Sequence, residues 1–241
     1  MGSPAPVRAY LDLDIDGHRA AHERARAFIA ATNLRYGWSS PDLAQLGGSE
    51  RARVEELYSI DHEWGSRGRI VLSACPHERL ELRLWPHLAP NAVDNFLSLC
   101  RGNRGLAKGS GRPLHYLHSH VHRVVPGFMM QGGDFVAGNG AGGESVWGGV
   151  FKDERGGLSV KVDRRGLLCM SNSGKNSNGS QFFVTFAGRA SLSGKHVVFG
   201  EVDLPRCEAV LAAVEAVGGG VDERPKVPVQ IVGCGVLDGG G

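Results

Sequence analysis

The stretch His122–Phe135 reads His-Arg-Val-Val-Pro-Gly-Phe-Met-Met-Gln-Gly-Gly-Asp-Phe, and the rest of the chain is interpreted around it. Apolar residues before and after Pro126-Gly127 predict two short strands joined by a turn. The Gly132-Gly133 pair lets the backbone bend or be approached closely. An ordinary buried pair of strands would fit this pattern. A more specific interpretation is a functional site on one face of these strands. That face would present a cation, an aromatic ring, a thioether and an amide, from Arg123, Phe128, Met129 and Gln131.

Two further stretches follow it. Residues Gly166–Phe183 read Gly-Leu-Leu-Cys-Met-Ser-Asn-Ser-Gly-Lys-Asn-Ser-Asn-Gly-Ser-Gln-Phe-Phe, and Gly194–Gly200 read Gly-Lys-His-Val-Val-Phe-Gly. In order and spacing, the three stretches together resemble the cyclophilins, the cyclosporin-type peptidyl-prolyl isomerases. The resemblance runs from Arg79 to Leu237. It implies a mainly β fold, a closed eight-stranded antiparallel β-barrel capped by two helices.

Periodicity elsewhere in the chain agrees with that architecture. Leu80, Leu82 and Leu84 alternate with polar residues, which predicts a strand with one buried face. Apolar residues recur at helical spacing over 90–100 and 207–217. Apolar runs predict further strands over 167–170, 182–184, 197–202 and 227–236.

The N-terminal part has a different character. Residues 8–17 alternate Leu or Ile with aspartate, which predicts a strand whose Asp12, Asp14 and Asp16 face solvent, in preference to a metal site. Residues 17–68 are rich in Ala, Arg and Glu and predict a mostly helical segment that the family pattern lacks. The aromatic residues that could give this segment a core are Tyr36, Trp38, Tyr58 and Trp64.

The placement of the helical segment has two solutions. If residues 10–16 form the first barrel strand, the segment is an insertion in the first hairpin; if residues 69–75 form it, the segment is an N-terminal extension. We favour the insertion. The expected organisation is therefore one cyclophilin-like domain over 7–238 with a helical insertion over 18–68.

The sequence lacks the residue sets that several classes of enzyme need for catalysis. No Ser-His-Asp order with a nucleophile context, no paired carboxylates and no metal-ligand set is evident, whereas prolyl isomerisation requires none of them. The resemblance implies that Arg123 is the catalytic residue, donating to the prolyl nitrogen, with no cofactor and no metal. It also implies a substrate groove formed by Phe128, Met129, Gln131, Gly140, Ser171, Asn172, Gln181, Phe183, Leu192 and His196.

The function implied is a peptidyl-prolyl cis-trans isomerase that acts on X-Pro bonds in proteins and assists folding. The alternative is a non-catalytic adaptor that binds proline peptides in the same groove. Ser191 stands where cyclophilins usually carry tryptophan, so we expect weakened cyclosporin binding. Other departures are Val121 in place of a Phe before His122, and Ser171 where Ala is common.

Composition argues against several other partners. The net charge of +2 does not indicate the clustered basic surface that binds nucleic acid. No apolar run reaches the roughly 20 residues that are needed to span a bilayer. The N-terminus Met1–Pro6 has no apolar signal core, so we expect a cytoplasmic monomer.

Three further motifs resemble known functional sites. His118, His120 and His122 alternate and would share a strand face, which could suggest a zinc or nickel site. No carboxylate or cysteine ligand lies near them in the sequence, so a metal site is disfavoured. Residues 138–143 match Gly-x-Gly-x-x-Gly, yet a poor helix former follows, so a dinucleotide loop is rejected. The loop 101–113, with Glu144, resembles the divergent-loop cyclophilins. That subset implies a redox-sensitive pair, Cys100 and Cys234, although two buried thiols are the simpler interpretation.

Overall fold

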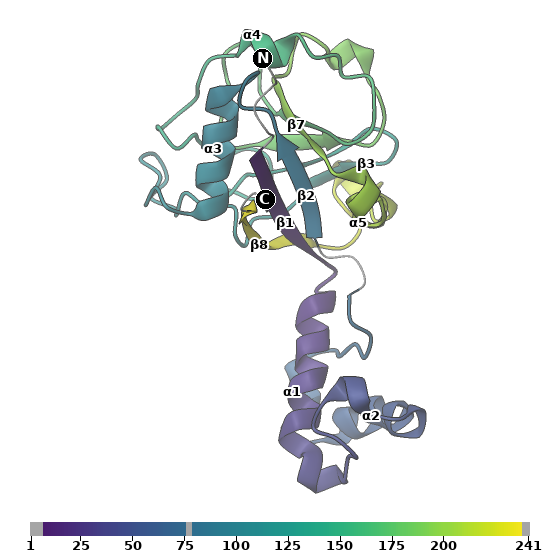
Figure 1. Ribbon diagram of the computed structural model, residues 1–241. Helices are drawn as coiled ribbons and strands as arrows, with labels where there is room; N and C mark the ends of the chain where they lie inside the picture. The colour runs from purple at the N-terminus through teal and green to yellow at the C-terminus, as the bar shows by residue number, and fades with distance from the viewer. Residues whose placement is uncertain (1–6, 76–78, 238–241) are drawn as a thin grey trace. The chain divides into compact units, whose positions relative to one another are not determined.

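The computed structural model describes residues 7–75 and 79–237, and the chain divides into two compact units (Figure 1). We call Met1–Ile15 with His77–Gly241 the sheet unit, and Asp16–Pro76 the helical unit. Strand β1 (Val7–Ile15) pairs antiparallel with β2 (Arg79–Leu84), from Val7 opposite Leu84 to Asp12 opposite Arg79. In sequence, the helical unit therefore lies between two paired strands.

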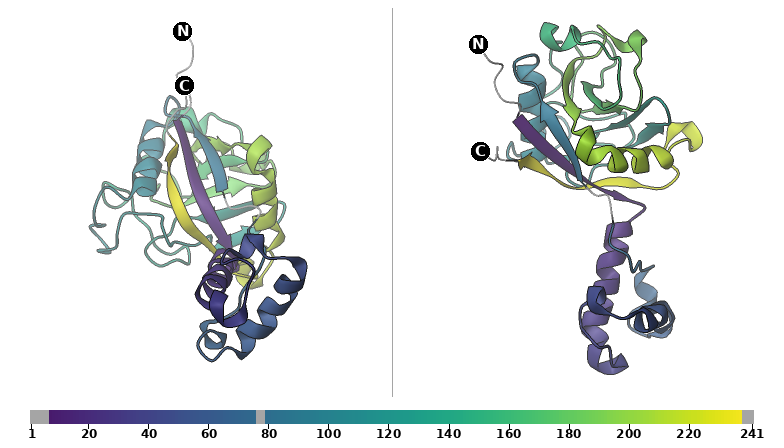
Figure 2. Two further views of the ribbon diagram at one scale, coloured as in Figure 1. Left: turned by 60° about the horizontal axis from the view of Figure 1, so that its bottom comes forward. Right: turned by 45° about the vertical axis from the view of Figure 1, so that its right-hand side comes forward.

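The sheet unit contains one eight-stranded sheet, in the order β3-β4-β6-β5-β7-β2-β1-β8, in which every neighbouring pair is antiparallel. Figure 2 shows the sheet curling on itself. The remaining strands are β3 (Arg123–Val125), β4 (Met129–Gly132), β5 (Leu167–Met170), β6 (Phe182–Thr185), β7 (Val198–Val202) and β8 (Val229–Leu237).

The expected closed barrel is confirmed only in part. In the described residues no strand ladder joins the edge strands β3 and β8. Instead, the segment before β3 reaches β8 through single hydrogen bonds, from Val121 N to the carbonyl of Val229 at 2.9 Å and from His118 N to that of Ile231 at 2.7 Å. The backbone of His118 is left-handed, with φ 70°, and this turn interrupts the extended run. The prediction that His118, His120 and His122 share one strand face is wrong for the same reason.

Among its described residues, the sheet unit contains the helices α3 (Pro90–Arg101), the short α4 (Arg155–Leu158) and α5 (Leu204–Ala216). Helix α3 packs on β1 and β8, whereas α5 packs on β2, β3 and β4. Helix α3 delivers Phe96 to a fully buried aromatic cluster with Tyr116, Phe182 and Phe199, at ring-centroid distances of 5.3–5.4 Å. Short 3-10 turns complete the chain at η1 (Leu43–Gln45), η2 (Gly65–Arg67), η3 (Ala190–Leu192) and η4 (Val221–Glu223).

The polar face predicted for β1 is wrong at two positions. Asp12 and Asp14 are buried, with 8% and 5% of their surface exposed, and Asp16 alone is exposed as predicted. A bulge in the pairing with β8 falls between Asp12 and Leu13 and breaks the simple alternation. Arg79 covers the carboxylate of Asp12 through bonds of 2.7 and 2.9 Å, and its guanidinium lies 4.0 Å from the ring centroid of Tyr10.

The helical unit is built on α1 (His18–Tyr36) and α2 (Gly48–Ile60). Phe28 is fully buried at its centre, with ring centroids of four other aromatic residues 5.1–6.5 Å away, those of Tyr36, Trp38, Tyr58 and Trp64. The predicted aromatic core of this segment is thus confirmed. No helix among the described residues combines the length and apolarity needed to cross a membrane.

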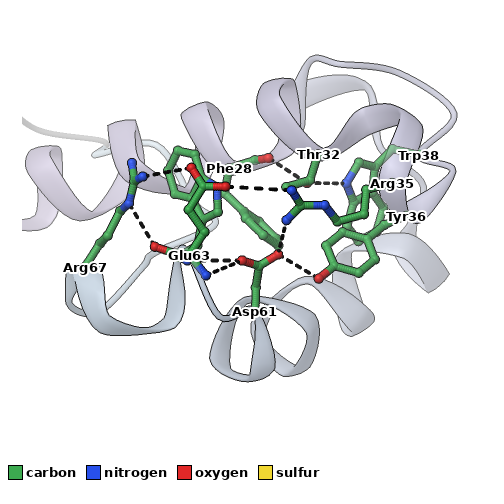
Figure 3. A network of polar contacts seen from close by, with 9 residues as sticks. Phe28, Thr32, Arg35, Tyr36, Trp38, Asp61, Glu63 and Arg67 are labelled. Carbon is green, nitrogen blue, oxygen red and sulfur yellow. Dashed lines mark hydrogen bonds and ion pairs between the residues drawn. The ribbon is translucent and has the colours of Figure 1, made fainter.

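A buried carboxylate ties the helical unit together (Figure 3). One oxygen of Asp61 accepts hydrogen bonds from Arg35 at 2.8 Å and the Tyr36 hydroxyl at 2.7 Å. The other accepts from the backbone N–H groups of Glu63 at 2.9 Å and Trp64 at 3.1 Å. Burial alone would raise the pKa of Asp61, but these donors together lower it. The carboxylate therefore joins the end of α1 to the segment that follows α2.

Candidate active site

The hairpin of β3 and β4 places the polar and apolar groups of the first motif on one face of the sheet. Arg123 lies opposite Gln131 in the β3–β4 pairing, and Gln131 lies opposite Phe183 in the β4–β6 pairing. Residues directly opposite each other in antiparallel strands project to the same face. The alternate residues, Val124 and Met130, are buried in the main core, so the candidate site lies on the other face of the sheet.

A cavity of about 250 Å³ opens on this face. Its apolar wall combines buried Met129 and Phe183 with half-buried Phe128 and Leu192, which pack on the same small core cluster. All of its lining residues belong to the predicted set: Arg123, Phe128, Met129, Gln131, Ser171, Asn172, Phe183, Leu192 and His196.

The other two predicted residues, Gly140 and Gln181, line an adjoining cavity of about 320 Å³. This second cavity shares Gln131, Ser171 and Asn172 with the first. The structure therefore brings all the predicted site residues into one continuous groove.

A chain of amide hydrogen bonds fixes the floor between the two cavities. The amide nitrogen of Gln131 donates to the hydroxyl of Ser171 at 3.0 Å and to the amide oxygen of Gln181 at 2.8 Å. Gln181 in turn donates to the carbonyls of Gly140 at 2.9 Å and Gly142 at 2.7 Å. Within the described residues no hydrogen bond uses the amide oxygen of Gln131, so this acceptor remains free in the cavity.

His196 forms the far edge of the pocket. Its Nδ1 lies 3.1 Å from the carbonyl oxygen of Met170, and its ring meets Phe183 edge-on, with centroids 5.1 Å apart at 87°. Burial lowers the pKa of His196, so the ring is neutral at pH 7. It contributes a flat, uncharged wall. Next to it, the side chain of Asn172 donates to the carbonyl of Lys195 at 3.0 Å.

Two charged residues at the rim were not predicted from the sequence. Glu223 accepts from Nε of Arg123 at 2.6 Å, across a sequence separation of 100 residues. The guanidinium carbon of Arg189 lies 5.4 Å from the ring centroid of Phe128, and its Nη2 donates to the carbonyl of Gly127 at 3.1 Å. No periodicity or motif links positions so far apart, so only the fold reveals them.

The loop over 101–113 is held by the acid that the resemblance associated with it. Glu144 accepts from the backbone N–H groups of Gly109 at 3.1 Å and Ser110 at 3.2 Å. Cys100 and Cys234 are free thiols, and the sulfur of Cys234 lies 3.5 Å from Nε2 of His115. The redox pair stays a prediction.

The family model described as "Cyclophilin type peptidyl-prolyl cis-trans isomerase/CLD" matches residues 70–236. The chain is 46% identical over 168 residues to "NK-tumor recognition protein" from Mus musculus, and to the protein of that name from Homo sapiens. The aligned region covers 70% of this chain but only 11% of each of those two proteins.

Proposed function

The chain belongs to the cyclophilin-type peptidyl-prolyl cis-trans isomerase family, and on that premise we propose that it accelerates the cis-trans isomerisation of X-Pro bonds in proteins. The observation that supports the proposal most strongly is the position of Arg123 at the side of an apolar pocket. A proline ring needs an apolar enclosure, and its nitrogen needs a donor at the moment the amide twists.

The barrier to isomerisation is the partial double bond of the peptide, roughly 18–20 kcal/mol. A protein lowers that barrier only if it binds the twisted amide more tightly than the planar forms. When the amide twists, its nitrogen regains a lone pair that can accept a hydrogen bond. A guanidinium beside that nitrogen therefore stabilises the transition state more than the ground state.

In this proposal the groove residues have separate tasks. Phe128, Met129, Phe183 and Leu192 enclose the proline ring, with His196 along one edge. Gln131 and Asn172 hold the peptide backbone, so that the residue before proline rotates while the ring stays fixed. Arg123 donates to the prolyl nitrogen. The groups act through position and charge, without a covalent intermediate.

The experiment is a protease-coupled isomerisation assay with a short X-Pro peptide. We expect the wild type to accelerate cis-to-trans conversion, and Arg123→Ala to lower kcat/KM by about 100-fold, as for loss of one preorganised donor. Arg164→Ala is the matched control, because Arg164 is 51% exposed, pairs with Glu201 at 3.0 Å and lines neither cavity. A folded wild type without acceleration would refute the proposal.

A further inference from the structure

The guanidinium of Arg123 is held along one edge. Its Nε and Nη2 both approach the same carboxylate oxygen of Glu223, at 2.6 and 2.5 Å. Its Nη1 has no hydrogen-bond partner among the described residues. The guanidinium carbon lies 6.0 Å from the ring centroid of Phe128. The Nε–Nη2 edge therefore faces Glu223, and Nη1 is left without a partner among the described residues.

The turn that carries Glu223 is packed against the strand that carries Arg123. It follows α5 and closes with hydrogen bonds between Gly220 N and the Arg224 carbonyl at 3.0 Å, and between Arg224 N and the Val221 carbonyl at 3.1 Å. Gly219 N also donates to the carbonyl of Val124 in β3 at 3.3 Å. A Cβ at Gly218 would lie 2.7 Å from the Val124 side chain, so glycine is needed for this close approach.

The backbone of the turn is held in an unfavourable conformation. Asp222 has φ 54° and Glu223 has φ 61°, the left-handed region that residues with a Cβ avoid. Two such residues in succession persist only where the surrounding structure imposes them, and such strain gathers at functional sites. Here the conformation presents the side chain of Glu223 to Arg123.

The ion pair with Glu223 has two opposing effects on Arg123 as a hydrogen-bond donor. The carboxylate offsets part of the positive charge of Arg123, which would weaken its hydrogen bond to a substrate. It also removes rotamer freedom from a long side chain, which favours one orientation. Because the side chains of Arg123 and Glu223 are 34% and 51% exposed, water screens the charge effect. The two charge-assisted contacts from Nε and Nη2 to one carboxylate oxygen also constrain the plane of the guanidinium, and we take this geometric constraint as the larger effect.

We propose that Glu223 is a positioning residue that fixes the Arg123 guanidinium with Nη1 directed at the prolyl nitrogen. This inference rests on the proposed isomerase function and names the group that prepares its catalytic residue. Glu223 itself touches no reacting atom.

The test uses two glycine variants of the full chain. Glu223→Gly and Asp222→Gly both relieve a left-handed residue in the same turn, but only the first removes the carboxylate from Arg123. We expect Glu223→Gly to lower kcat about tenfold with KM nearly unchanged, since a misoriented donor loses transition-state contacts. Asp222→Gly should match the wild type. With Arg123→Ala already present, Glu223→Gly should have no further effect.

A second readout follows the side chain without turnover. The Nε–H signal of Arg123 in nitrogen-15 NMR should be protected from exchange in the wild type and in Asp222→Gly, and lost in Glu223→Gly. An active wild type with equal kcat in the two glycine variants would overturn this inference alone, and so would a faster Glu223→Gly. An inactive wild type would overturn the isomerase function, and with it the role of Glu223.

Discussion

Ser191, which adjoins the cavity-lining Leu192, should influence how the protein responds to cyclosporin. Ser191 lies in η3, exposed and next to Leu192, where cyclophilins usually carry tryptophan. Serine offers neither the indole N–H nor the ring. We expect Ser191→Trp to tighten cyclosporin binding about tenfold or more, since one hydrogen bond contributes about 1 kcal/mol and the ring adds buried area.

Titration calorimetry would measure this affinity. Ser191→Phe serves as the control, because it restores an aromatic ring without a donor and should recover only part of the gain. Equal affinities for the serine and tryptophan proteins would show that another residue limits cyclosporin binding.

The thiol of Cys234 should react slowly at neutral pH. Burial, followed by the charge of Asp12, raises its pKa to about 11. Because only the thiolate reacts, the rate of alkylation should rise about tenfold per pH unit from pH 7 to pH 10. Mass spectrometry of the labelled peptide would follow the rate, with Cys234→Ser identifying the product. A rate that levels off near pH 8 or 9 would contradict this pKa.

The sequence predicted residues that line the two cavities, but it did not predict the charged residues beside them. Arg123, Gln131 and Phe183 lie in motifs whose spacing is characteristic of the family, and the sheet register brings them to one face. Glu223 lies in a glycine-rich turn without a motif, so its contact depends on a fold that brings residues 100 apart together. Local patterns contain no information about such a contact.

At the level of elements, the helical unit depends on the buried carboxylate of Asp61, whose side chain is 1% exposed. In Asp61→Asn an amide N–H₂ would face donors where an oxygen now accepts, which leaves buried groups unpaired. We expect faster amide hydrogen exchange throughout α1 and α2. Glu63→Gln is the control, because Glu63 is 48% exposed and its surface pairs contribute little. Equal exchange in both variants would contradict this role.

Acid should weaken the same unit. The folded-state pKa of Asp61 lies below its ordinary value of 3.8, so its stabilising contribution is present above that value and is lost as pH falls through the folded pKa. Far-ultraviolet circular dichroism during acid titration should show helix loss in the wild type below about pH 4. Asp61→Asn should begin less stable and show a smaller change over that window.

In strand β1 the alternation of apolar and polar residues does not predict which side chains are buried. The alternation predicted that the aspartates face solvent. A bulge between Asp12 and Leu13 breaks the alternation, and the guanidinium of Arg79 covers the carboxylate of Asp12. Alternation reports burial only when the pairing stays regular on both sides of a strand. Helix α3, in contrast, follows its predicted apolar periodicity and buries one face against the sheet, whereas α1 was expected from composition alone.

For the whole molecule, the three motifs in register carried the resemblance to the cyclophilins, and that resemblance implied the mainly antiparallel β fold that the structure has. The closed barrel that the resemblance implied is confirmed only in part, because no strand ladder joins β3 and β8 in the described residues and a left-handed turn at His118 interrupts the segment that approaches β8. The boundaries of the helical unit follow from the point where β1 ends and β2 begins.

Among the described residues of 16–75, none lines either cavity of the groove. We therefore expect a variant in which a short Gly-Asn turn replaces residues 16–76 to fold and to keep its kcat/KM within about twofold. The β1–β2 pairing supplies the frame for such a hairpin. A folded variant with a large loss of activity would show that the helical unit takes part in isomerisation.

In the proposed function the groove catalyses isomerisation and does more than bind proline peptides. The most direct test is NMR exchange spectroscopy on an X-Pro peptide at equilibrium, with the protein present at a small fraction of the peptide concentration. We predict cross-peaks between the cis and trans resonances with the wild type, and their near absence with Arg123→Ala. Peptide signals that shift on binding to the wild type without exchange cross-peaks would contradict the claim and identify the groove as a binding site.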